Sequence, residues 1–290
     1  KTKDWSFNFG FNISQNKNEI LELPENKNDE LYTFGNKNYA YSVMMGDPLG
    51  SFYGYRYKGV YQNVEETYAV NTSGQRILDI DGNPVVMKNG DQKVYPGDAR
   101  YEDVNGDGVI DENDIVYLGN SNPTLTGGLN FTLRYKKVSL VAAFHGRAGQ
   151  KVINQARMDM ENMRGKNNQS VAVLRRWRSE GDDTDIPRAL YDKGYNYLGS
   201  DRFVEDASFL RLKTVTLKYQ MPAKWMKAIG VNKLELYATG YDMFVWTKYK
   251  GQDPEVNLKA ANDGTVAQVA IDSNNTPKPF KIAFGLNLNF

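Results

Sequence analysis

Short segments in which apolar and polar residues strictly alternate recur along the chain. The clearest is the last, in which Ile282, Phe284, Leu286, Leu288 and Phe290 alternate with small or polar residues. Because successive side chains of a β-strand point to opposite faces of its sheet, this pattern predicts a strand with one apolar and one polar face. In a soluble protein it would be an exposed apolar edge, which invites aggregation. In an outer-membrane barrel the apolar face contacts lipid and the polar face lines the lumen.

The same alternation predicts about seven strands in all. We expect them over residues 3–14, 51–62, 124–135, 137–147, 205–220, 233–246 and 280–290. A tight turn at Lys136 and Lys137 joins two of them into a hairpin. In segment 205–220 the apolar residues share a parity with Arg211 and Lys213, so an apolar band is expected only over its later half.

Long polar connections separate the predicted strands. If the final strand ends in the periplasm, strand parity places 63–123, 148–202 and 251–279 outside the cell and 15–50 in the periplasm. Short helices are expected at 154–163 and 171–178.

The composition mainly excludes classes of function. The 36 basic and 35 acidic residues nearly cancel, which gives no electrostatic case for a nucleic-acid partner. No run approaches the roughly 20 apolar residues of a membrane helix, so a membrane role requires a barrel. Without cysteine there are no disulfides or thiolate metal sites. The single histidine, His145, is expected to be a polar, lumen-facing residue, and no catalytic constellation is recognisable, so we do not expect an enzyme.

A basic patch formed by Arg175, Arg176 and Arg178 around Trp177 allows two interpretations. Nucleic-acid binding is one. The other, which we favour, is a loop whose arginines form salt bridges with the acidic residues of 180–185.

Segment 103–114 has the spacing of a calcium-binding loop. Counted from the first aspartate, positions 1, 3, 5, 7, 9 and 12 are Asp103, Asn105, Asp107, Val109 (through its carbonyl), Asp111 and Asp114. Gly108 at position 6 permits the sharp turn, and oxygen ligands at this spacing suit a structural Ca²⁺. Position 12 is an aspartate, whose side chain is shorter than that of the usual glutamate, and no long flanking helices are evident. An Asx-rich turn that needs no ion is the alternative.

Several long motifs, in this order, resemble the C-terminal part of SusC-like TonB-dependent transporters of the Bacteroidetes outer membrane. They lie at 46–55, 96–98, 103–111, 208–217, 236–247, 253–256 and 284–290, so the similarity spans nearly the whole chain.

The resemblance implies an all-β fold, a transmembrane antiparallel β-barrel of roughly 22 strands closed by a plug. Residues 1–290 would form its C-terminal segment of about seven strands, with 63–123 and 148–202 as long extracellular loops. Because the plug, the TonB box and the N-terminal strands are absent, we expect a piece of a larger polypeptide or one member of a split one. Its remaining barrel and plug segment would be a required partner.

The resemblance also implies a location in the cell outer membrane and energised import of oligosaccharides or peptides. A SusD-like surface lipoprotein would be the partner, and TonB would act through the absent N-terminal part. The residues do not identify the substrate. A soluble β-rich carbohydrate-binding module, with tyrosines lining a glycan cleft, is the alternative function.

Overall fold

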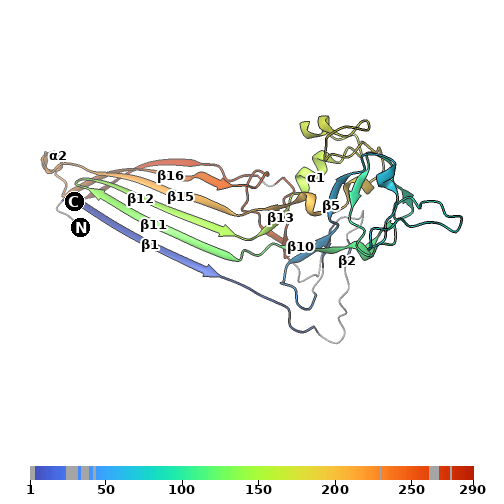
Figure 1. Ribbon diagram of the computed structural model, residues 1–290. Helices are drawn as coiled ribbons and strands as arrows, with labels where there is room; N and C mark the ends of the chain where they lie inside the picture. The colour runs from blue at the N-terminus through green and yellow to red at the C-terminus, as the bar shows by residue number, and fades with distance from the viewer. Residues whose placement is uncertain are drawn as a thin grey trace.

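The computed structural model of the chain is elongated, with a sheet of long strands at one end and a compact folded region at the other (Figure 1). It describes residues 4–23, 32–33, 39–41, 44–228, 230–260, 268–274 and 276–290. We call the sheet of long strands the wall. The smaller sheets, with the connections that carry them, are called the cap. In the described part of the chain, no helix is long and apolar enough to cross a membrane.

The wall is one antiparallel sheet in which each strand pairs with the next long strand along the chain. Six of the seven predicted strands are confirmed with shifts of a few residues. They are β1 (Trp5–Gln15), β11 (Leu125–Tyr135), β12 (Val138–Ala148), β15 (Phe209–Gln220), β16 (Lys233–Thr247) and β19 (Lys281–Asn289).

The register of the wall places apolar and polar residues on opposite faces. One row across the middle of the sheet consists of Phe9, Phe131, Ala142, Val215, Gly240 and Ile282. The row beside it on the other face consists of Asn8, Thr132, Val141, Thr216, Thr239 and Ala283. Large apolar side chains of the first face are exposed, for example Phe9 (57 %) and Phe284 (81 %). The wall therefore has an apolar face without a protein core behind it.

A bulge at Lys213 keeps the apolar face continuous. Ala143 and Phe144 of β12 pair with Thr214 and Leu212 of β15, so Lys213 is an extra residue that inverts the parity of its strand. Leu212 and Leu210, which pair with Phe144 and Gly146, therefore continue the apolar face. The expectation that the apolar band covers only the later half of 205–220 was wrong, because it assumed an unbroken alternation.

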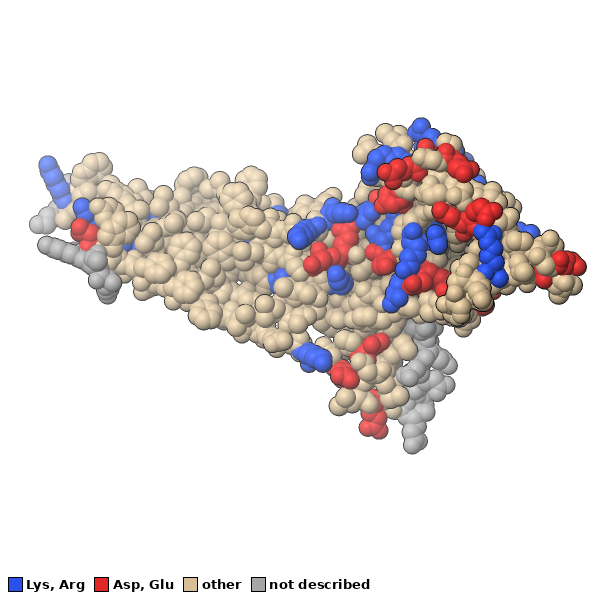
Figure 2. Space-filling view, viewed as in Figure 1, with Lys and Arg blue, Asp and Glu red and all other residues tan. Residues whose placement is uncertain are grey.

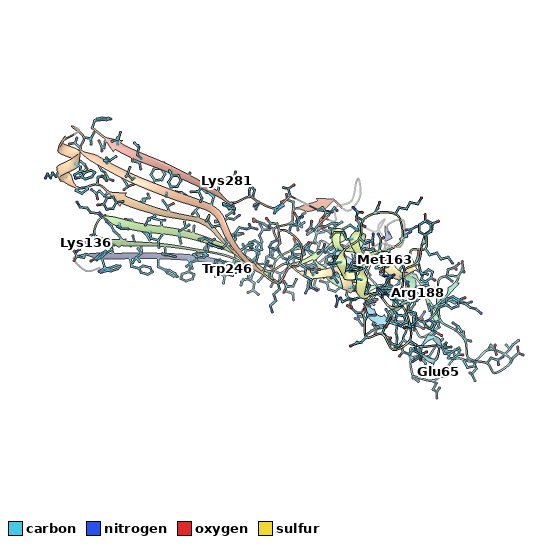
Figure 3. The ribbon with its side chains drawn as sticks, turned by 90° about the horizontal axis from the view of Figure 1, so that it is seen from above. Glu65, Lys136, Met163, Arg188, Trp246 and Lys281 are labelled. Atoms are coloured by element: carbon cyan, nitrogen blue, oxygen red, sulfur yellow. The ribbon has the colours of Figure 1, made fainter. Side chains whose placement is uncertain are left out.

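All long connections leave the wall at the cap end. Gln15 pairs with Leu125, and the backbone N–H of Asn16 donates to the carbonyl of Thr124, so β1 and β11 meet there. The opposite end carries the Lys136 turn, where φ is 51°, and the connection that contains α2 (Ala223–Ala228). Figure 3 shows Lys136 at this turn end and Arg188 in the cap. The C-terminus also lies at the turn end (Figure 1), as does Asp4, whose carbonyl accepts a hydrogen bond from the backbone N–H of Lys136.

The predicted strand at 51–62 is not part of the wall. The structure has two short strands instead, β4 (Ser51–Gly54) and β5 (Tyr57–Val60), which belong to different sheets of the cap. All four residues of β4 are buried, so its aromatic residues pack in a protein core and do not face lipid. The predicted strand parity, which placed 15–50 in the periplasm and so on the same side as the Lys136 turn, was therefore wrong. The described residues of 16–124 form one connection at the cap end.

The cap consists of short strands and single helical turns. Its sheets are β10-β4-β3-β2, β5-β8, β7-β6-β9, β13-β14 and β17-β18. The strands not yet given are β2 (Tyr32–Thr33), β3 (Ala40–Tyr41), β6 (Lys88–Asn89), β7 (Gln92–Lys93), β8 (Ala99–Tyr101), β9 (Val109–Ile110), β10 (Val116–Asn120), β13 (Lys151–Ile153), β14 (Val204–Asp206), β17 (Leu258–Ala260) and β18 (Gln268–Ala270). The helices are α1 (Gln155–Glu161) and the 3-10 turns η1 (Glu65–Thr67), η2 (Glu112–Asp114), η3 (Val171–Arg175), η4 (Tyr195–Tyr197) and η5 (Asp201–Phe203).

The two long connections predicted as separate loops fold together in the cap. One buried cluster joins Tyr61 and Tyr101 of the first connection to Leu198 of the second. The carboxylate of Asp98, which is fully buried, accepts two hydrogen bonds from the guanidinium of Arg188, at 2.7 and 3.2 Å. Such a bidentate pair fixes both position and orientation. The cap is therefore one packed body with its own core.

Candidate functional site

The polar face of the wall carries most of its ionisable groups. The wall strands contain seven Lys and Arg but only two Asp and Glu, and the register places the cations on the polar face or at the bulge. His145 lies on this face, as expected, and its ring contacts that of Phe209 at 5.9 Å between centroids. Charges are dense on the cap and sparse on the visible side of the wall (Figure 2).

An ion cluster joins the wall to the connection between β16 and β19. Arg211, whose side chain is 3 % exposed, lies 2.5 Å from a carboxylate oxygen of Asp253 and 3.3 Å from one of Glu255. Lys213 at the bulge lies 3.1 Å from Glu255 and 3.4 Å from Asp242, whose φ is 49°. The bulge thus points a lysine toward carboxylates from two other segments. We call these residues, together with Lys278, the ion cluster.

Glu255 is the anionic centre of the ion cluster. Lys278 lies 2.5 Å from the same carboxylate oxygen that Lys213 and Arg211 approach. Burial of the carboxyl raises its pKa, but hydrogen bonds from Lys278 and Lys213 outweigh that effect and lower the pKa of Glu255 to about 2. The sequence contained the signal for this cluster in the motifs at 208–217 and 253–256, but nothing in their spacing indicated that they meet.

The acidic loop lies in the cap, beside β9 and η2, with its carboxylates bound to its own backbone. The oxygens of Asp103 accept hydrogen bonds from the N–H groups of Gly106, Asp107 and Gly108 at 2.7 to 3.2 Å. The carboxylate of Asp114 accepts from Val104 and Asp111.

The other predicted ligands are also engaged locally. Asp107 accepts from the N–H of Val109 and from the amide of Asn105, and Asp111 caps η2 through the N–H of Asn113. Among the described residues, which include all of 103–114, no group of three or more His, Cys, Asp or Glu is arranged to hold a metal ion. As the side chains stand, the loop is a set of Asx turns.

The calcium site stays a prediction, and a titration decides it. A calcium loop of the extracellular kind would bind with a Kd on the order of 10⁻⁴–10⁻³ M. Isothermal titration of the whole protein with CaCl₂ measures this, with the double variant Asp103→Ala, Asp107→Ala as the negative control. Equal heats from both proteins would leave the loop as Asx turns alone.

The basic patch is only partly as predicted. η3 lies at the expected helical position, but in the described part of the chain no ion pair joins Arg175, Arg176 or Arg178 to an acidic residue. The guanidinium groups of Arg176 and Arg178 donate to backbone carbonyls of η3, and Asp182 accepts from backbone N–H groups. The salt-bridged interpretation was therefore wrong in its partners. The tryptophan within the patch packs on Gly97, where a Cβ would meet its ring at 2.2 Å.

A narrow arm, residues 68–86, projects from the cap at the end away from the wall (Figure 1). Isolated bridges join Tyr68 to Val86 and Leu78 to Pro84. At its tip the carboxylate of Asp79 accepts hydrogen bonds from the N–H groups of Asp81 and Asn83, at 2.9 and 2.8 Å, which fixes the turn. Ile80 in this turn is fully exposed (102 %). The arm thus presents an apolar side chain between two acidic ones.

The sequence is similar to curated TonB-dependent receptors along its full length. It is 32 % identical over 296 residues to TonB-dependent receptor P26 of Formosa agariphila, covering all of this chain and 28 % of the relative. It is 26 % identical over 300 residues to TonB-dependent receptor SusC of Bacteroides thetaiotaomicron, again over all of this chain and 25 % of the relative. The chain therefore spans little more than a quarter of the length of these relatives. No family model matches the sequence.

Solved structures with the same fold include the RagAB peptide importer in its closed-closed state, with a TM-score of 0.70, 24 % identity and coverage of 100 % of this chain and 28 % of the other. The open-open state of the same importer gives a TM-score of 0.67 at 21 % identity, with 27 % of that chain covered. This likeness establishes the fold. Along its whole length the chain is thus similar, in sequence and in fold, to a segment of SusC-like TonB-dependent receptors.

Proposed function

We propose that the chain forms the C-terminal barrel wall and part of the extracellular surface of an outer-membrane importer of oligosaccharides or peptides. The observation that carries this proposal is the two-faced wall: a row of exposed apolar residues on one side and polar residues on the other. A sheet with an uncovered apolar face and no core behind it suits lipid on that side and a lumen on the other.

The arrangement of the connections supports an orientation. Outer-membrane barrels have short periplasmic turns and long extracellular loops. The Lys136 turn and the α2 connection would then lie in the periplasm, and the cap, including 63–123 and 148–202, would lie outside the cell. Since the first and last wall strands each have one partner among the described residues, further strands of the same receptor would continue the barrel on both sides.

Import and orientation can be tested on the whole receptor in cells. Cysteine at Val171 in the cap (82 % exposed) is expected to react with a membrane-impermeant maleimide on intact cells. Cysteine at Trp225 in α2 (62 % exposed) is expected to react only after the outer membrane is opened. Uptake of labelled oligosaccharide and peptide mixtures is expected to stop when the receptor is deleted or the proton gradient is collapsed. Uptake of both mixtures that survives deletion would contradict the import proposal.

The arm supports a SusD-like surface lipoprotein as the partner outside the cell. It projects from the cap away from the wall, so the membrane that would surround the wall does not reach its tip (Figure 1). Its fixed turn presents Ile80 at no further ordering cost, and preorganised contacts of this kind favour binding. The flanking carboxylates of Asp79 and Asp81 suit a partner pocket bordered by lysine or arginine.

Replacing Ile80 with serine is expected to weaken the partner complex about ten-fold, because loss of an apolar anchor costs roughly 1–2 kcal/mol. Co-purification of the lipoprotein with the tagged receptor, followed by a binding titration of the purified pair, measures this. Val171→Ser, which removes another exposed aliphatic side chain of the cap (82 % exposed), is the matched control. If the two variants bind the partner equally well, the arm is not the docking element.

A further inference from the structure

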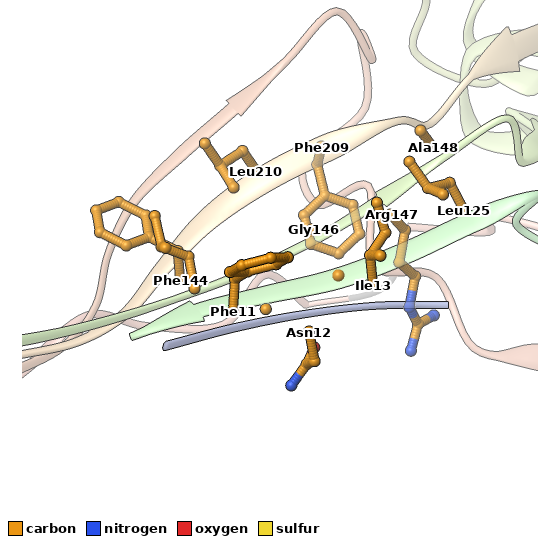
Figure 4. Close-up of a pocket in the computed structure, with 13 residues that line it drawn as sticks. Phe11, Asn12, Ile13, Leu125, Phe144, Gly146, Arg147, Ala148, Phe209 and Leu210 are labelled. Carbon is orange, nitrogen blue, oxygen red and sulfur yellow. The ribbon is translucent and has the colours of Figure 1, made fainter. Parts of the chain in front are cut away.

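We propose that Arg147 is a recognition residue for a carboxylate or other anionic group on the imported cargo. This inference rests on the proposed import function and adds the charge class of the ligand. Arg147 lies near the end of β12, where it pairs with Thr126 of β11 and Phe209 of β15. Figure 4 shows its side chain and that of Asn12 on one side of the sheet, opposite Phe11 and Leu210. Its guanidinium therefore belongs to the polar face at the cap end of the wall.

Arg147 has no charged partner in the described part of the chain. It is half-buried, and it forms neither an ion pair nor a side-chain hydrogen bond there. Desolvating a guanidinium without a partner is costly. A ligand that supplies an anion would recover that cost.

Other shielded arginines in the same region are paired. Arg157 contacts Glu161 and Glu205, Arg202 contacts Glu161, and Arg211 contacts Asp253 and Glu255. The cations that line the large cleft beside the arm, of about 580 Å³, are also paired, since Lys58 contacts Glu102 and Arg100 contacts Glu66. Arg147 thus differs from these three arginines, each of which contacts a carboxylate.

A recess of about 240 Å³ lies beside Arg147, where the wall meets the cap. Its lining includes Asn257, together with Ser121 and Gln150, which are held by the protein: the hydroxyl of Ser121 accepts from the N–H of Ala270, and the amide nitrogen of Gln150 donates to the carbonyls of Ala207 and Pro254. The volume is below the range that encloses a whole small ligand, so the recess suits an end group. The planar guanidinium of Arg147 fits a carboxylate there, which it can bind through two parallel hydrogen bonds.

The surrounding charge favours the same ligand class. Asp253 and Glu255 neutralise Arg211 and Lys213, but the wall strands retain an excess of cations on the polar face. A passage lined by one sign of charge concentrates ions of the opposite sign and speeds their arrival. An anionic cargo would be attracted to this face, on which Arg147 lies at the cap end.

The test uses the purified whole receptor and two labelled probe pools, uronic-acid oligosaccharides and glutamate-containing peptides. Each pool has a neutral counterpart in which the carboxylates are methyl-esterified. We expect wild-type receptor to bind one acidic pool at least ten-fold more tightly than its ester, and Arg147→Gln to lose that preference. Arg147→Lys retains the charge without the fork and is expected to be intermediate. Arg134→Gln removes a cation at the opposite end of the same face and is expected to retain the preference.

The result also identifies the source of the carboxylate, since only the recognised pool shows the preference. The proposal is overturned if wild type binds no acidic pool better than its ester, or if Arg147→Gln preserves the preference. It is also overturned if Arg147→Gln weakens acidic and neutral pools equally or lowers only the melting temperature, because Arg147 would then pair with another part of the receptor. Import that stops on receptor deletion while the preference is absent would leave the transport function intact and remove only this proposal.

Discussion

Replacing Val215 with arginine is expected to destabilise the barrel by about 2–4 kcal/mol, the cost of a cation at the lipid-facing middle of a barrel strand. Val215 lies in the central row of the apolar face, between Ala142 and Gly240. A charge there has neither water nor a carboxylate within the sheet to stabilise it. The folded fraction of the whole receptor, measured by heat-modifiable migration after refolding into bilayers, should fall by at least ten-fold at the wild-type midpoint.

Val141→Arg is the matched control for this substitution. Val141 is also a half-buried valine, it lies one row away in the same sheet, and it faces the polar side opposite Thr132 and Thr216. The same arginine there is expected to cost much less than at Val215. Equal losses from the two variants would mean that the two faces do not differ in environment, and the assignment of the apolar face to lipid would fail.

Replacing Arg211 with alanine is expected to cost about 3–5 kcal/mol, because Asp253 and Glu255 would lose a buried partner. The segment around 253–255 would then detach from the bulge of β15. A lower melting temperature in detergent and new protease cleavage between β16 and β19 measure this effect. Arg211→Lys, which retains the charge without the planar fork, is expected to lie between wild type and Arg211→Ala. An unchanged cleavage pattern in Arg211→Ala would show that the ion cluster does not hold this segment.

Acid is expected to weaken the same attachment through Glu255. Since its pKa is lowered from 4.5 to about 2 in the folded chain, its stabilising effect is fully present above pH 4.5 and is lost as the pH falls toward 2. The melting temperature of wild type should therefore drop across that window. Glu255→Gln does not titrate there, so its profile should lack this component, and coincident profiles would contradict the assignment.

The wall could be predicted from the sequence because, in a strand with lipid on one side, almost every residue takes part in the alternation of apolar and polar side chains. The prediction failed where a pattern had another cause. The tyrosines after Ser51 alternate as a wall strand would, yet β4 is buried on both faces in the cap. At Lys213 one additional residue inverted the alternation, and only the pairing with Ala143 and Phe144 reveals it.

The site was less accessible because it depends on contacts between distant segments. Arg211 and Asp253 meet only after β15 has packed against the connection between β16 and β19. Asp98 and Arg188 lie on two different long connections. The acidic loop shows the converse limit. The spacing of Asp103, Asp107 and Asp114 is compatible with a metal loop and with Asx turns. Their carboxylates accept backbone hydrogen bonds within the loop, and calcium binding stays a prediction.

The long connection between β1 and β11, which forms part of the cap, bears on the order of folding. Pairing Trp5 with Tyr135 closes a long stretch of chain, and the entropy of loop closure opposes such a contact in an unfolded polypeptide. Folding of the first connection brings Asn16 beside Thr124 and so shortens the effective loop to almost nothing. We therefore expect the cap to acquire structure before β1 joins the sheet. A destabilising change in the cap core, such as Tyr61→Ala, would then slow assembly of the wall although it lies far from every wall strand pair.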